Sequence, residues 1–181
     1  TALTWRKYLD EQYANGIWNT NACPIVIRYA EVLLTYAEAV NELSGPSADV
    51  YDKLDLIRGR VGMPKVDREK YASKETLRRL IRRERGVELA GEGVRRADIL
   101  RWKDDNGKMV AETVLNGVLE RVVGTVNYAE TDPTKRAEID TNAPATDKKI
   151  EDRVFKVHNR YNPIPQGAID NNPNLEQNPG Y

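Results

Sequence analysis

Residues 25–64 decide the fold, and they read IVIRYAEVLLTYAEAVNELSGPSADVYDKLDLIRGRVGMP. From Ile27 to Leu43 the apolar residues recur three and four positions apart, which is the spacing of one face of an α-helix. The run Ser44-Gly45-Pro46 ends this helix, because glycine accepts a left-handed cap and proline cannot continue the helix. Ser47 is suited to cap a second helix. The stretch therefore predicts a helical hairpin.

The hairpin from Glu31 to Pro64 spans about 34 residues, the length of a tetratricopeptide (TPR) repeat. The polar residues of its first helix fill one narrow arc: Arg28, Glu31, Thr35, Glu38 and Glu42. A helix with so narrow a polar arc is covered on both flanks by neighbours, and we expect Tyr29 and Tyr36 to lie in the core. Further helices are expected from about 74 to 90, capped by Ser73, and from Val94 to a buried Trp102.

The remainder of the chain is less regular. Residues 108–126 read as a strand bounded by Gly117 or as a frayed helix, and we favour the strand. Residues 127–150 read as a polar loop, and RVFKVHNRY (153–161) reads as a second strand that could pair with the first. After Asn162 the chain is rich in proline and asparagine, so we expect an ordered tail without helix or strand. Ile164, Ile169 and Leu175 are expected to attach this tail to the helical body. The predicted fold is mainly α, with TPR-like hairpins, a loop-rich remainder and a short β-hairpin.

Composition excludes several classes of function. The chain has 28 basic and 28 acidic residues, so no global field favours nucleic acid or an anionic membrane. The lone cysteine, Cys23, excludes an intrachain disulfide. The most apolar segment carries Arg28, Glu31 and Glu38 and is too short and too charged to span a bilayer. The first residues also lack the charged-then-apolar pattern of a signal peptide.

Two glutamates on the third helix are the strongest candidates for chemistry. Glu84 and Glu88 fall one turn apart in the middle of an apolar stripe formed by Leu77, Leu80, Ile81 and Val87. The arginines of the same helix are expected on its other side, Arg85 among them. A catalytic pair would need a cleft, and a metal site would need histidines, of which His158 is the only one. Because a buried carboxylate is costly unless paired, we predict a structural Glu–Arg network. Its expected arginines are Arg58, Arg60, Arg95, Arg96 and Arg101.

Other motifs are weaker. The arginine run LRRLIRRERG (77–86) reads as a solvated helix face, and GEGVRR (91–96) as a helix break that follows a helix rather than a strand. We therefore predict no catalytic residue, cofactor, metal or nucleic-acid partner. Trp5, Tyr13 and Trp18 lie outside the strongly periodic segments, which makes them weak candidates for stacking on a sugar or a partner.

Three stretches in order resemble one family. PIVIRYAEVLLTYAEAVNEL leads into YDKLDLIRGRVGMP, RRERGVELAGEGVRRADILRW follows, and the chain ends PIPQGAIDNNPNLEQNPGY. Their order and spacing are similar to the C-terminal half of the SusD/RagB family, the surface nutrient-binding lipoproteins of Bacteroidetes. The resemblance covers residues 24–102 and 153–181. It departs from the family at Gly86 and Gly91, where bulkier residues are usual.

The resemblance implies a non-enzymatic protein that binds glycans or other nutrients and delivers them to a SusC-like TonB-dependent transporter. It also implies attachment to the outer membrane at the cell surface through a lipid-bearing N-terminal cysteine that is absent from this chain. Residues 1–24 would connect to a missing N-terminal part, 25–102 would form the TPR-like region, and 103–181 would pack on those helices. The alternative is a TPR-like protein–protein interaction domain without sugar binding, with an enzyme using Glu84 and Glu88 as a distant third.

Overall fold

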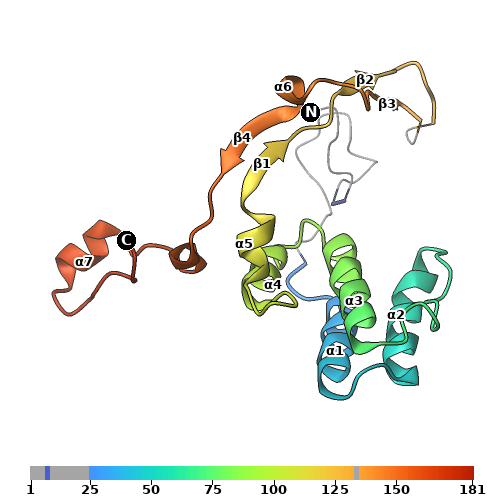
Figure 1. The fold of residues 1–181 in the computed structure, drawn as a ribbon, viewed down its shortest axis with the longest axis horizontal. Coiled ribbons are helices and arrows are strands. Elements are labelled where there is room, and N and C mark those ends of the chain that lie inside the picture. The colour runs from blue at the N-terminus through green and yellow to red at the C-terminus, as the bar shows by residue number, and fades with distance from the viewer. Residues whose placement is uncertain (1–6, 9–24, 133–134) are drawn as a thin grey trace. The chain divides into compact units, whose positions relative to one another are not determined.

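The computed structural model describes residues 7–8, 25–132 and 135–181, and the chain is mainly α-helical as predicted (Figure 1). It divides into two compact units: the described residues of the first are 7–8 and 25–96, and those of the second are 97–132 and 135–181. The boundary falls within the short helix α4 (Arg95–Arg101). Among the described residues, no helix combines the length and the apolar character needed to cross a membrane.

The described residues of the first unit are built around three helices. The predicted hairpin is confirmed as α1 (Tyr29–Ser44) and α2 (Ala48–Arg60), and α3 (Lys74–Glu88) follows after a loop. The hydroxyl of Ser47 accepts from the backbone N–H of Val50, and Ser73 and Thr76 form a reciprocal capping box at the start of α3. Because α1 contacts both α2 and α3, it is the central helix of the unit.

The core of this unit lies where the three helices meet. Its buried apolar residues come from all three helices and from the neighbouring loops: Leu33, Leu34, Ala37, Val50, Tyr51, Leu54, Ile57, Val66, Leu77, Leu80, Ile81 and Leu89. Asn41 is fully buried among them, and its amide donates to the carbonyl of Lys74 at 3.1 Å. This bond ties the end of α1 to the start of α3.

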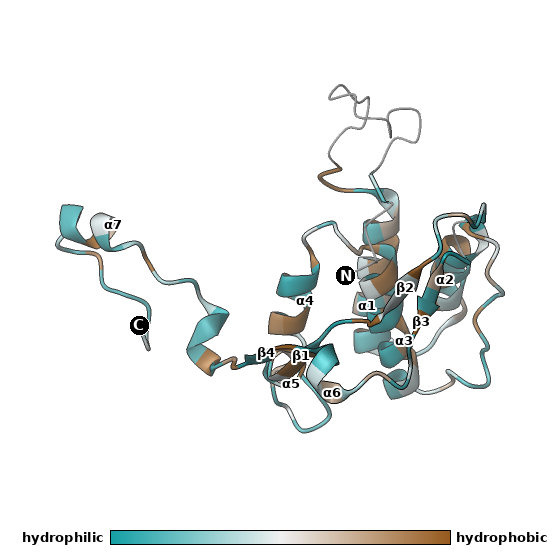
Figure 2. Cartoon of the chain, turned by 90° about the horizontal axis from the view of Figure 1, so that it is seen from above, coloured by the Kyte–Doolittle hydropathy of each residue, from teal (hydrophilic) through white to brown (hydrophobic). Residues whose placement is uncertain are grey.

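The orientation of α1 differs from the prediction. Tyr29 and Tyr36 are 71% and 44% exposed rather than buried, whereas Glu38 of the polar arc is 9% exposed. The helix turns its polar arc towards α3 and presents an apolar flank to solvent. Figure 2 shows hydrophobic residues recurring along α1 between hydrophilic ones. Helical periodicity places residues on a common face, but it does not state which face meets the neighbouring helix.

Helix α3 also departs from the prediction at two positions. Val87 is exposed and Arg85 is buried, the reverse of what the apolar stripe predicts. Val87 stands near the end of α3 at the edge of its inner face, where a side chain is easily left uncovered. Arg85 stands on the opposite edge of that face, against the polar arc of α1.

The second unit has its own small core. Ile99, Trp102 and Ala111 are buried, which confirms the placement of Trp102, and partly buried residues including Phe155 pack around them. The helix α5 (Val110–Val114) precedes the strand β1 (Gly117–Glu120), which pairs antiparallel with β4 (Lys149–Arg153). A second ribbon pairs β2 (Gly124–Val126) with β3 (Ala137–Ile139), and α6 (Ala145–Lys148) precedes β4.

The expected pairing of two strands is present, but its second strand lies earlier in the sequence. β4 ends at Arg153, where the predicted strand begins, and Val157–Arg160 forms a short 3-10 helix. The side chain of Asn116 explains the change of direction. Its amide oxygen accepts from the N–H of Phe155 at 2.6 Å, and its amide nitrogen donates to the carbonyl of Phe155 at 3.1 Å. Beyond Arg153, the side chain of Asn116 therefore takes the place of β1 as the hydrogen-bonding partner of the backbone.

The prediction that no helix follows Asn162 is wrong, because α7 (Gln166–Asn171) forms there. The prolines flank this helix and do not interrupt it. Pro165 precedes its first residue, and Pro173 comes two residues after its last. Proline is well tolerated where a helix begins, since the first N–H groups of a helix have no partner within it.

Candidate functional site

A polar seam joins α1 to α3, and we define it by Arg28, Thr35, Glu38 and Glu42 on the α1 side and Arg78, Arg85 and Glu88 on the α3 side. Arg78 Nη2 donates to Glu42 Oε2 at 2.7 Å near the end of α1. Arg28, which directly precedes α1, donates to Glu88 Oε1 at 2.5 Å near the end of α3. The two helices therefore run antiparallel along the seam, with an ion pair near each end.

Arg85 lies in the middle of the seam. Its guanidinium donates to Thr35 Oγ1 at 3.0 Å and lies 3.6 Å from Glu38 Oε2. Its side chain is only 5% exposed. A cation removed from water to this extent needs charged or polar partners, and the polar arc of α1 supplies them.

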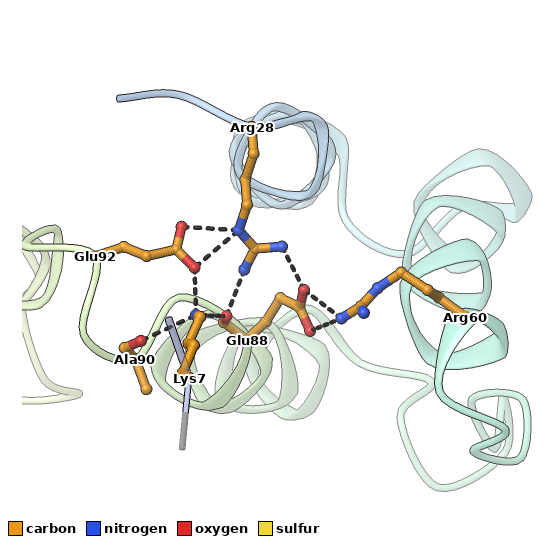
Figure 3. A network of polar contacts seen from close by, with 6 residues as sticks. All are labelled: Lys7, Arg28, Arg60, Glu88, Ala90 and Glu92. Atoms are coloured by element: carbon orange, nitrogen blue, oxygen red, sulfur yellow. Dashed lines mark hydrogen bonds and ion pairs between the residues drawn. The ribbon is translucent and has the colours of Figure 1, made fainter. Parts of the chain in front are cut away.

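Glu84 and Glu88 face inward and bind different arginines. Glu84 accepts from Arg58 Nη1 at 2.5 Å, which links α3 to α2. Glu88 accepts from Arg28, and it also accepts from Arg60 Nη2 at 2.7 and 2.9 Å through its two oxygens (Figure 3). One carboxylate therefore connects the segment before α1 with the last turn of α2.

A second carboxylate completes the cluster at the end of α3. Arg28 Nε donates to both oxygens of Glu92 at 2.8 Å, and Lys7 Nζ donates to Glu92 Oε1 (Figure 3). The side chain of Glu92 is 4% exposed. Burial by itself raises the pKa of this carboxyl, but the hydrogen bonds from Arg28 and Lys7 outweigh it and hold the pKa below its usual value. Hydrogen bonds to Glu92 and Glu88 in turn raise the pKa of Arg28 above its usual value, against the effect of burial.

The cluster also caps the C-terminal end of α3. Lys7 Nζ donates to the carbonyls of Glu88 and Ala90 at 2.9 Å each, and Arg28 Nη2 donates to the carbonyl of Glu88. The last carbonyls of a helix lack partners within it and carry partial negative charge, so cations are favoured there. We call Lys7, Arg28, Arg60, Glu88 and Glu92 the α3-end cluster.

The predicted network residues are thus only partly the observed ones. The contacts of Glu84 and Glu88 with Arg58 and Arg60 fall within the predicted set. Arg28, Lys7 and Glu92 were missed by sequence reasoning, and the place of Arg28 in the polar arc of the predicted first helix was the one available signal. Participation of Arg95 and Arg96 stays a prediction, as does the structural role of the network.

Arg95 does have a defined place beside α3. A Cβ added to Gly86 would lie 3.3 Å from Nη1 of Arg95 and 3.8 Å from its Cζ. The guanidinium of Arg95 therefore crosses α3 at the glycine. This packing gives a physical reason for an otherwise unfavourable glycine within the helix.

The other candidate residues give little chemistry. Trp5, Tyr13 and Trp18 lie outside the described residues, so their role as a stacking surface stays a prediction. Within residues 7–8, 25–132 and 135–181, no three His, Cys, Asp or Glu side chains are grouped so that they could hold a metal ion. His158 packs edge-on against the ring of Tyr181, with ring centroids 4.9 Å apart.

The C-terminal motif forms a closed clasp through its side-chain amides. Gln177 accepts from the N–H of Ile164 at 2.8 Å and donates to the carbonyl of the same residue at 2.9 Å. Asn178 donates to the carbonyl of Asn162 at 2.7 Å. Two side chains of the final residues thus hold the backbone on the other side of α7, which closes the loop 162–178.

The last residue continues the clasp. The hydroxyl of Tyr181 donates to the carbonyl of Tyr161 at 2.9 Å and accepts from the amide of Asn159 at 3.1 Å. Gly180 has a φ of +95°, and a Cβ there would lie 2.7 Å from the Cβ of His158. Only glycine fits this position without rearrangement. The packing of Ile164, Ile169 and Leu175 against the helical body stays a prediction.

Comparison with known proteins settles the family. The model of the SusD family matches residues 1–181, the whole chain. The chain belongs to the SusD family. Its resemblance to SusD/RagB proteins is thereby confirmed.

Relatives of this SusD-family chain are considerably longer. SusD-like proteins P25 and P2 of Formosa agariphila are 40% identical over 79 residues and 38% identical over 93 residues. These matches cover 43% and 49% of the chain but only 15% and 18% of the relatives. The crystal structure of a SusD-like protein from Bacteroides fragilis superposes with a TM-score of 0.65 at 28% identity, over 87% of this chain and 26% of that one. The SusD-family fold seen here therefore corresponds to about a quarter of that solved chain.

Proposed function

We propose that the chain is the C-terminal part of a SusD-family lipoprotein that binds a glycan or another nutrient and delivers it to a SusC-like TonB-dependent transporter. The observation that carries this proposal is the family match over residues 1–181. The longer protein, called the parent protein below, would be held at the outer-membrane surface by a lipid on an N-terminal cysteine outside these residues. The proposal includes no catalytic step.

The described side chains are consistent with a scaffold role for this part. Glu84 and Glu88 are each engaged by arginines, and Glu92 is engaged by Arg28 and Lys7. A general acid or base needs a proton that it can exchange with a substrate. Carboxylates held in this way serve the packing of helices instead. Nutrient contacts in the proposed function are therefore assigned mainly to the rest of the parent protein.

Binding of sugars by the parent protein is the test. Isothermal titration with a panel of oligosaccharides should give measurable binding by the parent protein and weak or no binding by residues 1–181 alone. Tight binding by residues 1–181, abolished by Trp18→Ala, would place the site among the aromatic residues of the N-terminal segment. If the parent protein bound no glycan and did not co-purify with its transporter, the proposed function would be wrong.

The alternative function, a TPR-like interaction domain, has one observation in its favour. The outer face of α1 is apolar and exposed, with Tyr29 and Val32 at 71% and 52%. A helical hairpin with such a face is suited to holding another helix. Co-purification of the parent protein with a soluble partner instead of a transporter would favour this alternative.

A further inference from the structure

Two asparagine–glycine pairs lie close together in the second unit, Asn106-Gly107 and Asn116-Gly117. A further pair, Asn15-Gly16, lies outside the described residues. Asparagine is one of the chemically labile residues of proteins. A following glycine increases this lability, because no Cβ hinders the approach of its backbone nitrogen to the asparagine side chain. Both asparagines of the second unit are exposed, so sequence and exposure alone would assign them the same reactivity.

The reaction of such a pair is the loss of ammonia. The backbone nitrogen of the glycine attacks the amide carbon Cγ of the asparagine, and a new C–N bond forms as the bond from Cγ to the amide nitrogen breaks. The backbone proton leaves with that nitrogen as ammonia. Water then opens the resulting cyclic imide at either carbonyl, which gives aspartate or isoaspartate. Water is the only co-reactant, and the reaction requires that the asparagine side chain can turn onto the following nitrogen.

The side chain of Asn116 is held away from this reaction. Its amide nitrogen donates to the carbonyls of Glu112 at 2.7 Å and Phe155 at 3.1 Å. Its amide oxygen accepts from the backbone N–H of Phe155 at 2.6 Å. The amide cannot turn onto the nitrogen of Gly117 without breaking these bonds. The reaction therefore proceeds only from the small fraction of molecules in which this contact has opened.

The side chain of Asn106 lacks such a restraint. It is exposed on the turn 104–108, and no described residue forms a hydrogen bond with its side-chain amide. The turn is held by its backbone instead. The N–H of Asn106 donates to Asp104 Oδ1 at 2.9 Å, and the N–H of Gly107 donates to the carbonyl of Asp104 at 3.0 Å. Only this last bond must open before the nitrogen of Gly107 can attack, and opening costs little in an exposed turn.

The turn that carries Asn106 closes beside the small core of the second unit. The N–H of Asp104 donates to the carbonyl of Lys108 at 2.8 Å, and the N–H of Val110 donates to the carbonyl of Trp102 at 3.0 Å. Trp102 is buried. Isoaspartate routes the main chain through the former side chain and lengthens it by one methylene group. Its formation at Asn106 would therefore disturb the backbone next to a core residue.

We propose that Asn106 is a site of spontaneous deamidation, and that the hydrogen bonds from Asn116 to Phe155 and Glu112 protect the second pair from the same reaction. The two pairs share one chemistry, and their different hydrogen bonding separates their rates. The inference does not depend on the proposed function, so a failure of the parent protein to bind glycans would leave it intact.

Peptide mapping of the parent protein tests the inference. The protein is incubated at physiological temperature and mildly alkaline pH, in native buffer and in guanidinium chloride, and is then digested with trypsin. Cleavage after lysine and arginine separates the two sites into DDNGK (104–108) and MVAETVLNGVLER (109–121). Mass spectrometry measures the deamidated fraction of each peptide, and samples without incubation correct for deamidation during digestion. In native buffer Asn106 should react roughly tenfold faster than Asn116, or more, since several hydrogen bonds hold the latter. In guanidinium chloride the two rates should become similar.

Gly107→Ala is the control for the chemistry. It should slow deamidation of Asn106 and leave Asn116 unchanged, because the added Cβ hinders attack only at the first pair. A rate at Asn106 that is unaffected by Gly107→Ala would overturn the assigned reaction. Equal native rates at the two asparagines would overturn the protection of Asn116. An Asn106 that stays intact in native buffer would show that the folded protein closes this site, and the proposal would be wrong.

Discussion

Arg28 and Glu92 are 64 residues apart in the sequence, yet the guanidinium of Arg28 donates to both carboxylate oxygens of Glu92. The same guanidinium binds the carboxylate and the carbonyl of Glu88. One side chain at the start of α1 therefore holds the end of α3 and the turn that follows it. Within the α3-end cluster, Arg28 binds both glutamates.

Removal of the Glu88 carboxylate should destabilise the first unit. Glu88→Ala leaves Arg28 with Glu92 but takes the partner from Arg60, and it removes the link between α1 and α2. Arg60 is 59% exposed and loses little, but the Arg28–Glu88 pair is largely buried, and breaking such a pair costs up to about 3 kcal/mol. Urea unfolding measures the change, and Glu69→Ala, at an exposed position before α3, should alter stability by less than about 0.5 kcal/mol. An equal effect of both variants would show that the cluster has no structural role.

Stability should fall in acid because of Glu92 and Glu42. Hydrogen bonds from Arg28 and Lys7 lower the pKa of Glu92 despite its burial, and the hydrogen bond from Arg78 lowers the pKa of Glu42. The folded state therefore binds fewer protons than the unfolded state. The stability that these two carboxylates contribute is fully present above the unfolded pKa of about 4.3, and it is lost as the pH falls through their lower pKa values in the folded state. Urea unfolding between pH 7 and pH 3 should show a shallower decline for Glu92→Gln than for Glu69→Gln, and identical profiles would contradict this account.

Two glycines within helices give a matched test of the Arg95 contact. A Cβ at Gly59 in α2 would meet nothing within 4 Å, so Gly59→Ala should stabilise the protein by about 1 kcal/mol through helix propensity alone. Gly86→Ala should gain less, because its Cβ would press on the guanidinium of Arg95. In the Arg95→Ala background, Gly86→Ala should gain as much as Gly59→Ala, which a double-mutant cycle measures. Equal gains for the two single variants would remove the packing explanation for Gly86.

The clasp at the C-terminus should open when Gly180 is replaced. Gly180→Ala combines an unfavourable positive φ with a contact of 2.7 Å to His158, and either alone favours detachment. Amide exchange at Asn178 and Tyr181 should accelerate, and the ring signals of His158 should shift as the edge-on contact with Tyr181 is lost. Gly167→Ala, in α7 with nothing within 4 Å of its Cβ, is the matched control and should leave both unchanged. A clasp that survives Gly180→Ala would show that its amide bonds suffice.

The sequence by itself determined the local structure of the helical unit. Ser47 and Ser73 mark helix starts, and Gly45, with a φ of +79°, follows the last residue of α1. These signals act through hydrogen bonds between residues a few positions apart, so they can be read without knowing the fold. The same holds for the inward direction of Glu84 and Glu88, which follows from the helical repeat.

Only the tertiary structure decided which faces meet and which residues pair. The polar arc of α1 reads as a solvated face, but it binds Arg78, Arg85 and Glu88, while Tyr29 stays exposed. The helical repeat groups residues on a face and carries no information on what lies opposite. The partners of Glu88 and Glu92 come from segments some 30 to 85 residues away. Their selection depends on how the helices pack, because a buried charge binds the opposite charge that the packing brings to it.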